Sequence, residues 1–281
     1  MLSPALLLHR GAANVCSHLV FLLSRYQYSI GRMSAVTYYV LLGAVAGGFV
    51  QGLSGFAFGL VAMTVWVWVV APQLAGPLVV FGSLIGQLLL LGSLWRSLDG
   101  RRLFPFILGG CLGTPVGVWM LRYIDPTVFK MAVGLILVVY CPLLLCIGSV
   151  PRITAGGRLA DGGIGLIGGV MSGLGGLNGP APTLWCSLRG WPPDEQRAVF
   201  QAFILCMQSL TLAIYAMSGL ITVEALRLFA IITPAIILPT LIGVRLYARF
   251  SDAGFRQLIL VLLSLSGIVL LIASVPRLLT R

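Results

Sequence analysis

The sequence has few charged residues. Asp, Glu, Lys and Arg make up 9% of its 281 residues, and only seven residues are acidic, whereas soluble domains carry about 25% charged residues. Apolar residues make up 59%, and several apolar runs exceed the about 20 residues that a helix needs to cross a bilayer. These runs lack the alternating pattern of a β-barrel. We therefore expect an all-α polytopic membrane protein that has the lipid bilayer as a partner.

The signatures of metal and nucleic-acid sites are also missing. None of the six cysteines belongs to a CxxC pair, so neither a disulfide framework nor a zinc site is expected. The net charge of +11 comes from basic residues scattered among short loops, without the basic and aromatic motifs of nucleic-acid-binding proteins. We expect no metal, no cofactor and no nucleic-acid partner.

Histidine is scarce, which bears on catalysis. The string Gly52-Leu53-Ser54-Gly55 could present a serine nucleophile, but serine hydrolysis needs a base, usually histidine. Both histidines, His9 and His18, lie upstream of every predicted span. An intramembrane serine hydrolase at Ser54 is therefore the least favoured alternative, and we expect no enzymatic activity.

The first 32 residues differ from the rest of the chain. They have only short apolar stretches, and Met33 stands immediately before the first long apolar segment. No cleavage site follows an apolar core, which argues against a secretory signal peptide. We interpret residues 1–32 as an N-terminal extension that is either untranslated or peripheral.

Long apolar runs predict the membrane spans. Six are long enough to cross a bilayer: 74–95, 103–121, 128–149, 198–217, 228–247 and 256–275. Segments 35–70 and 161–189 are apolar too, but glycine clusters interrupt both. A helix over 35–70 would be about 54 Å long, far more than the about 30 Å of a bilayer core. We expect two short helices in each segment, arranged as a re-entrant hairpin or as two short spans.

The two interrupted segments are copies of each other. A shift of 121 residues places Gly47-Gly48 on Gly168-Gly169, and Gln87 on Gln208. The chain thus divides into repeat 1 at 35–149, a linker at 150–160 and repeat 2 at 161–275. Each repeat holds a glycine-broken pair of short helices and three transmembrane helices. Because five segments is an odd number, repeat 2 enters from the opposite face, and we expect the inverted repeats of secondary transporters.

Basic residues predict the orientation. The loops 96–102, 150–160, 188–197 and 245–256 are rich in arginine, whereas the opposite loops hold only Arg122, Lys130 and Arg227. By the positive-inside rule, the arginine-rich side is cytoplasmic. Both termini would then lie outside.

The duplicated glycine breaks predict a binding site. A helix broken in mid-membrane exposes N–H groups at the start of its second half, and these favour an anion. We expect the second halves to begin near Gly55 and Gly176 and to converge on one pocket. The predicted substrate-binding residues flank these points or lie on the following helices: Gln51, Gly52, Ser54, Gly55, Phe56, Gln87, Gly173, Gly176, Asn178 and Gln208.

Other interpretations of the same residues stay open. The glycines also fit the small-xxx-small spacing with which membrane helices pack closely, and a lone buried glutamine often only joins two helices. All seven acidic residues fall in loops or at span ends, where they do not suggest an intramembrane proton relay. An anion channel or facilitator is the alternative to a permease. The sequence indicates neither the transport direction nor an oligomeric state.

The duplicated motifs resemble those of one transporter family. The strings G-G-F-V-Q-G-L-S-G-F-A-F-G and G-G-V-M-S-G-L-G-G-L-N-G-P, together with R-G-W-P-P-D-E-Q-R-A at 189–198, resemble the sulfite exporter TauE/SafE family over about residues 35–275. The resemblance implies transport of small anions, such as sulfite, sulfoacetate and organosulfonates, across the bacterial inner membrane, with no enzyme activity and no prosthetic group. Many members carry a triple glycine where this chain has Gly55-Phe56-Ala57, which implies a bulkier first pocket.

Overall fold

The computed structural model describes residues 35–90, 99–146, 156–249 and 253–279. Ten helices lie in these ranges and no strand does. The first helix is Ala35–Ser54. The others are α2 (Phe58–Val69), α3 (Pro72–Leu90), α4 (Gly100–Tyr123), α5 (Pro126–Cys146), α6 (Gly157–Gly175), α7 (Pro180–Leu188), α8 (Pro193–Met217), α9 (Val223–Arg249) and α10 (Ala253–Leu279). The predicted extension 1–32 lies outside the described residues. Of the described residues, 35–39 belong to one unit and those from Val40 onward to another.

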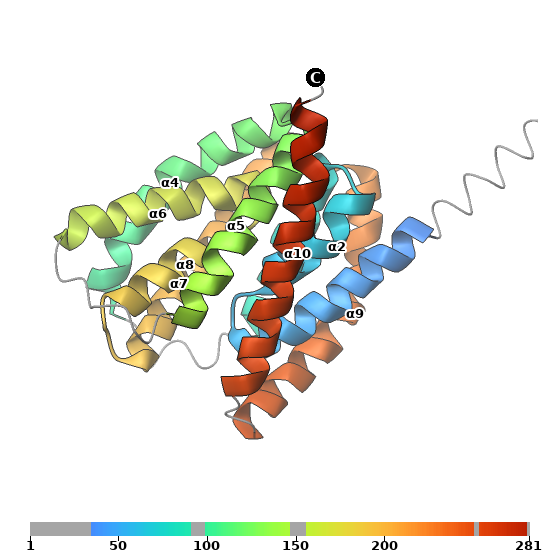
Figure 1. Ribbon diagram of the computed structural model, residues 1–281. Coiled ribbons are helices and arrows are strands. Elements are labelled where there is room, and N and C mark those ends of the chain that lie inside the picture. Colours follow the sequence, from blue (N-terminus) through green and yellow to red (C-terminus); the bar gives the residue numbers. More distant parts are fainter. Residues whose placement is uncertain (1–34, 91–98, 147–155, 250–252, 280–281) are drawn as a thin grey trace, which may run out of the picture. The chain divides into compact units, whose positions relative to one another are not determined.

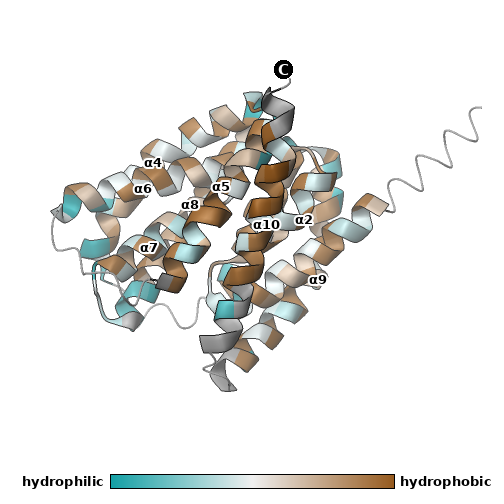
Figure 2. Cartoon of the chain, viewed as in Figure 1, coloured by the Kyte–Doolittle hydropathy of each residue, from teal (hydrophilic) through white to brown (hydrophobic). Residues whose placement is uncertain are grey.

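The helices are apolar enough to cross a membrane. By length and composition six of those described could do so: the first helix, α3, α4, α5, α8 and α9. Hydrophobic residues run along the helices, and hydrophilic residues lie mostly near their ends (Figure 2). Such exposed apolar surface marks a membrane-facing protein. On α4 it forms a stripe at nearly helical spacing, made of Phe104, Leu108, Leu112, Val116, Trp119 and Tyr123.

Each interrupted segment folds into a helical hairpin. In the first, α2 returns along the first helix, and Trp66 Nε1 donates a hydrogen bond of 3.1 Å to Val40 O. In the second, α7 returns along α6, and Trp185 Nε1 donates to Asp161 Oδ1 at 2.7 Å. A pair of adjacent helices of this kind agrees both with a re-entrant hairpin and with two spans. The expectation of two short helices in each segment was wrong for the leading helices: the first helix has 20 residues and α6 has 19. The second helix of each pair is short, as expected.

Two closely packed helix pairs hold the hairpins in place. Figure 1 shows α4 and α6 side by side, and α5 beside α10. The α4–α6 pair meets through glycines from both helices, where a Cβ atom on either side would lie closer than 3.0 Å to the opposite backbone: Gly109, Gly113, Gly117, Gly165, Gly169 and Gly173. The first helix meets α9 in the same manner, through Gly52 and Gly243.

Helix ends follow from local sequence. Asp99 begins α4 because its carboxylate accepts a hydrogen bond of 2.9 Å from Arg101 N. Pro180 and Pro193 begin α7 and α8, at the first-turn position that proline tolerates because that N–H lacks a helical partner in any case. Prolines such as Pro115 and Pro234 lie inside long helices, as is common in membrane proteins.

Candidate functional site

The first break, residues 55–57, separates the first helix from α2. Gly55 has φ +84°, a left-handed conformation that glycine adopts without steric strain. The Ser54 hydroxyl donates to Val50 O at 2.9 Å and accepts from Ala57 N at 3.2 Å. Ser54 therefore stabilises the turn at the break, as a capping residue stabilises a helix end.

The second break, residues 176–179, separates α6 from α7. Gly176 has φ +70°, and its N–H donates to Ser172 O at 2.7 Å. Asn178 is buried; its Nδ2 donates to Ile204 O at 3.3 Å, and its Oδ1 accepts from Gln208 Nε2 at 3.0 Å. Both breaks thus turn on a left-handed glycine, but the second uses an amide side chain where the first uses a hydroxyl.

The two breaks are in contact with each other. A Cβ atom built on Gly59, in the first turn of α2, would lie 3.2 Å from Gly176 O. A Cβ atom built on Gly179, just before α7, would lie 3.0 Å from the Phe56 ring. The starts of the two short helices, predicted to converge, therefore lie side by side in the protein interior.

Gln87 and Gln208 occupy matching places at the two breaks. Gln87 Nε2 donates to Gly55 O at 2.7 Å, and Gln208 Nε2 donates to Gly176 O at 3.1 Å. Neither residue is exposed at all. Each glutamine therefore holds the carbonyl of the left-handed glycine that is 32 residues before it.

Helices α3 and α8 pass both breaks in opposite directions. Along α3, Val79 contacts Gly176 and Gln87 binds Gly55. A Cβ atom built on Gly176 would lie 2.8 Å from Val79 Cγ1. Along α8 the order is reversed, because Gln201 lies against Gly55 and Gln208 binds Gly176. On each helix the two contacts are about two turns apart, so Gly55 and Gly176 lie about 10 Å apart along these helices.

Two residues at the first break were missing from the predicted site. Arg197 and Gln201 lie one turn apart on α8. The Arg197 Nη2 atom lies 3.8 Å from where a Gly55 Cβ atom would stand, and Gln201 Nε2 lies closer still. Gln201 is 3% exposed. The sequence analysis placed Arg197 in a cytoplasmic loop, whereas it belongs to α8. Arg197 and Gln201 are four residues apart, a spacing that places both on one face of a helix. This spacing could have indicated the pair from the sequence.

Gln51 and Phe56 complete the surroundings of the first break. Gln51 is fully buried, and its Nε2 donates to Ser83 O on α3 at 3.0 Å. The Phe56 ring packs edge-on against Phe200 and Tyr140, with centroid distances of 5.8 and 6.3 Å. The aromatic side chain that the sequence analysis associated with a bulkier first pocket therefore lies in an aromatic cluster with α5 and α8.

Gly52 and Gly173 lie at helix contacts. A Cβ atom on Gly52 would meet Thr240 O of α9, and one on Gly173 would meet Thr114 O of α4, both closer than 3.0 Å. Close packing therefore accounts for glycine at these two predicted site positions.

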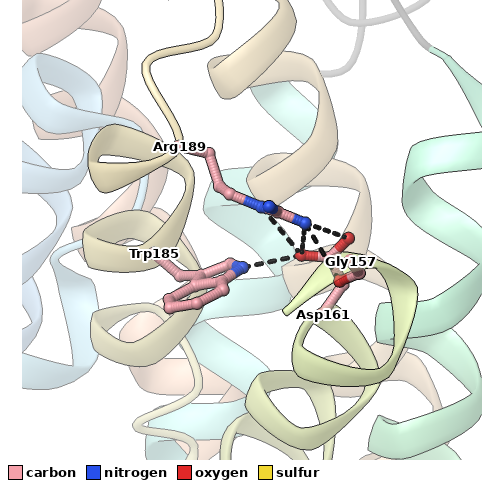
Figure 3. A network of polar contacts seen from close by, with 4 residues as sticks. All are labelled: Gly157, Asp161, Trp185 and Arg189. Carbon is pink, nitrogen blue, oxygen red and sulfur yellow. Dashed lines mark hydrogen bonds and ion pairs between the residues drawn. The ribbon is translucent and has the colours of Figure 1, made fainter. Parts of the chain in front are cut away.

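A buried ion pair joins the two ends of the second hairpin (Figure 3). Arg189, at the end of α7, contacts both carboxylate oxygens of Asp161, at 3.1 and 3.2 Å, and donates to Gly157 O at 3.0 Å. Trp185 donates to the same carboxylate. Asp161 is 4% exposed, so its charge is neutralised and fully hydrogen-bonded, as a buried carboxylate requires.

A second ion pair lies at the start of α8. Arg102, near the start of α4, contacts Glu195 at 2.5 Å, and its guanidinium lies 4.8 Å from the centroid of the Trp191 ring. Both ion pairs therefore lie at helix ends next to the arginine-rich loops.

Comparison with known proteins places the chain in a family. The family model for Sulfite exporter TauE/SafE matches residues 39–270, a range that includes both hairpins and every helix that contacts the two breaks. Neither the curated proteins nor the solved structures gave a match. Members of the family are membrane transporters and not enzymes. The chain belongs to the sulfite exporter TauE/SafE family of multi-pass membrane transporters.

Proposed function

We propose that the protein is a permease for a small anion, either sulfite, an organosulfonate or a related sulfur oxyanion. The observation that carries the proposal is the contact between the two helix breaks, with Gly59 beside Gly176 O and Gly179 beside Phe56. The site would comprise the first turns of α2 and α7 together with the side chains that surround the breaks.

Backbone groups supply part of the anion recognition. In α2, the N–H groups of Phe58, Gly59 and Leu60 have no acceptor within the helix. Helix α7 begins Pro180-Ala181-Pro182, so Ala181 alone among these three residues offers an N–H group, because proline has none. The helix dipole adds partial positive charge at the starts of both helices. Anions bind at such helix starts. Because the starts of the two helices adjoin, their fields would add over one anion.

Arg197 supplies a full positive charge beside the first break. Its guanidinium reaches to within 3.8 Å of the position of a Gly55 Cβ atom, and guanidinium groups match the planar oxygen pairs of oxyanions. The 121-residue shift puts Gly76 in the corresponding position of the first repeat. The proposed site is therefore asymmetric, with its cation on the α8 side.

Inverted repeats would give this site alternating access. In support, the ends of the first hairpin meet at Trp66 and Val40, those of the second meet at Asp161 and Arg189, and α3 and α8 pass the breaks in opposite directions. Rocking of one repeat against the other around a fixed site is the usual mechanism in such transporters. We place the protein in the bacterial inner membrane, with the Asp161–Arg189 end cytoplasmic and both termini outside.

Anion binding to the purified protein tests the proposal. Thermal unfolding would be followed with sulfite, sulfate, sulfoacetate and acetate, because a ligand that binds only the folded state raises the midpoint. We expect at least one sulfur oxyanion to stabilise the wild type. Arg197→Gln should weaken that binding about 10- to 100-fold, the equivalent of about 1.5–3 kcal/mol for a charged hydrogen bond.

Arg158→Gln is the matched control, because Arg158 is exposed on α6. It should bind the anion as the wild type does. The absence of stabilisation by every anion, or equal weakening in both variants, would contradict the proposed site.

A further inference from the structure

Three buried glutamines at the breaks share an unusual feature. Gln51, Gln87 and Gln208 are completely buried, and in each the Oε1 atom has no hydrogen-bond partner among the described residues. Each Nε2 atom donates to a backbone carbonyl. If an amide were flipped, its Oε1 atom would face the backbone carbonyl oxygen that Nε2 now donates to, and the two oxygens would repel each other. The flipped orientation is therefore excluded. The orientation of the three free oxygens is thereby fixed by the donor bonds.

Gln51 and Gln87 lie together at the end of the first helix. A Cβ atom built on Gly86, the residue before Gln87, would lie 2.9 Å from Gln51 Oε1. Gln51 O accepts the Gly55 N–H at 2.7 Å, and Gln87 holds Gly55 O. The missing side chain at Gly86 therefore leaves the Gln51 amide directly against α3, one residue along the chain from Gln87, whose amide holds the first break.

The chemistry of this place is that of a cation site. The last carbonyls of a helix have no partner within it, and the dipole puts partial negative charge at the same end. Two buried amide oxygens without donors add to that charge. Burial of such an oxygen without a partner is unfavourable. Sites for divalent cations such as Ca²⁺ gain affinity from the charge of their carboxylate ligands. Neutral oxygens alone supply no such charge, so they suit a hard monovalent cation more.

We propose that Gln51 Oε1 and Gln87 Oε1, with carbonyls at the end of the first helix, bind a sodium ion. Broken helices in transporters use their C-terminal ends for such ions and their N-terminal starts for anionic groups. The cation and the anion would thus lie on opposite sides of one break. The coupling of sodium to anion movement rests on the proposed function, whereas sodium binding does not.

Sodium binding to the purified protein is the direct test. Sodium-22 binding would be measured without any transported anion, in buffer with choline as the balancing cation. We expect saturable binding to the wild type and at least tenfold weaker binding in Gln87→Leu. Gln196→Leu is the matched control, because both ends of the Gln196 amide have protein partners, Ser187 and Trp191. It should bind sodium as the wild type does.

A charged variant separates binding from structural damage. Gln51→Glu loses the bond from Nε2 to Ser83 O but adds a carboxylate at the site. If sodium binds there, the added negative charge should raise sodium affinity at least several-fold at pH 8, a gain that a purely structural role would not give. No saturable binding to the wild type, or unchanged affinity in both Gln51→Glu and Gln87→Leu, would overturn the proposal.

Coupling is tested separately in proteoliposomes. An inward sodium gradient should accelerate anion flux relative to choline. If the anion flux does not depend on sodium, coupling is contradicted but the permease function is not. If no anion shows any flux, the proposed function is contradicted, and the sodium-22 result is unaffected.

Discussion

Ser54 shows how one side chain can suggest catalysis and serve structure. Its hydroxyl donates to Val50 O and accepts from Ala57 N. The side chain therefore pairs backbone groups at the point where the first helix ends. The second break manages without this serine, because Gly175 stands in the corresponding position. The hydroxyl is therefore a local support for one break.

Ser54→Ala is expected to reduce the free energy of unfolding by about 1 kcal/mol, as the loss of a helix cap does, and to preserve transport. Thermal unfolding and anion flux would both be measured. Ser209→Ala is the control, because that exposed hydroxyl bonds only the Leu205 carbonyl of its own helix. Complete loss of flux in folded Ser54→Ala would return Ser54 to a chemical role.

The repeat made some of the residues at the two breaks predictable. Gln87 and Gln208 were found because a shift of 121 residues aligns them, and each proves to hold the carbonyl of a left-handed glycine. Arg197 and Gln201 align with Gly76 and Val80, so no comparison of repeats could find them. Their proximity to Gly55 depends on how α8 packs against a distant segment.

At the scale of elements, glycines decide which helices pair. The inward face of α4 carries Gly113 and Gly117, which meet the α6 backbone around Gly169 and Gly173. Without a hydrophobic driving force in lipid, such close approach supplies the association between helices. Gly113 and Gly117 have the small-xxx-small spacing that indicates close helix packing, but the spacing could not say that α6 would be their partner.

Gly173→Ala is expected to destabilise the protein by about 1–3 kcal/mol, because its Cβ would overlap Thr114 O on α4. Gly163→Ala is the control on the same helix. No atom lies within 4 Å of its Cβ position, so alanine should raise stability by up to about 1 kcal/mol through helix propensity. Thermal unfolding in detergent measures both, and equal midpoints would show that the α4–α6 contact is looser than described.

At the scale of the whole molecule, apolar runs predicted the long helices well. The six runs correspond to α3, α4, α5, α8, α9 and α10, because a bilayer fixes the length of an apolar helix. The arrangement of the broken segments was not predictable, since apolar composition alone does not distinguish a hairpin from two short spans. In the structure, long-range bonds hold the two helices of each broken segment together, Trp66 to Val40 and Arg189 to Asp161.

Opposite entry of the two hairpins predicts opposite labelling. Ala71 and Pro192 are both exposed, lie just after α2 and α7, and align at the 121-residue shift. In a variant without the native cysteines, Ala71→Cys should react with a membrane-impermeant thiol reagent from outside the cell, and Pro192→Cys only from the cytoplasmic side. Labelling of both from the same side would refute the inverted repeats.

Flux of a sulfur oxyanion into proteoliposomes tests the central claim most directly. The wild type should show saturable flux. Gly55→Ala and Gly176→Ala should each reduce it at least tenfold, because alanine at φ +84° or +70° strains the turn and meets Gln201 or Val79, while Gly163→Ala should match the wild type. If folded Gly55→Ala and Gly176→Ala both transported as the wild type does, the two breaks would not form the transport site.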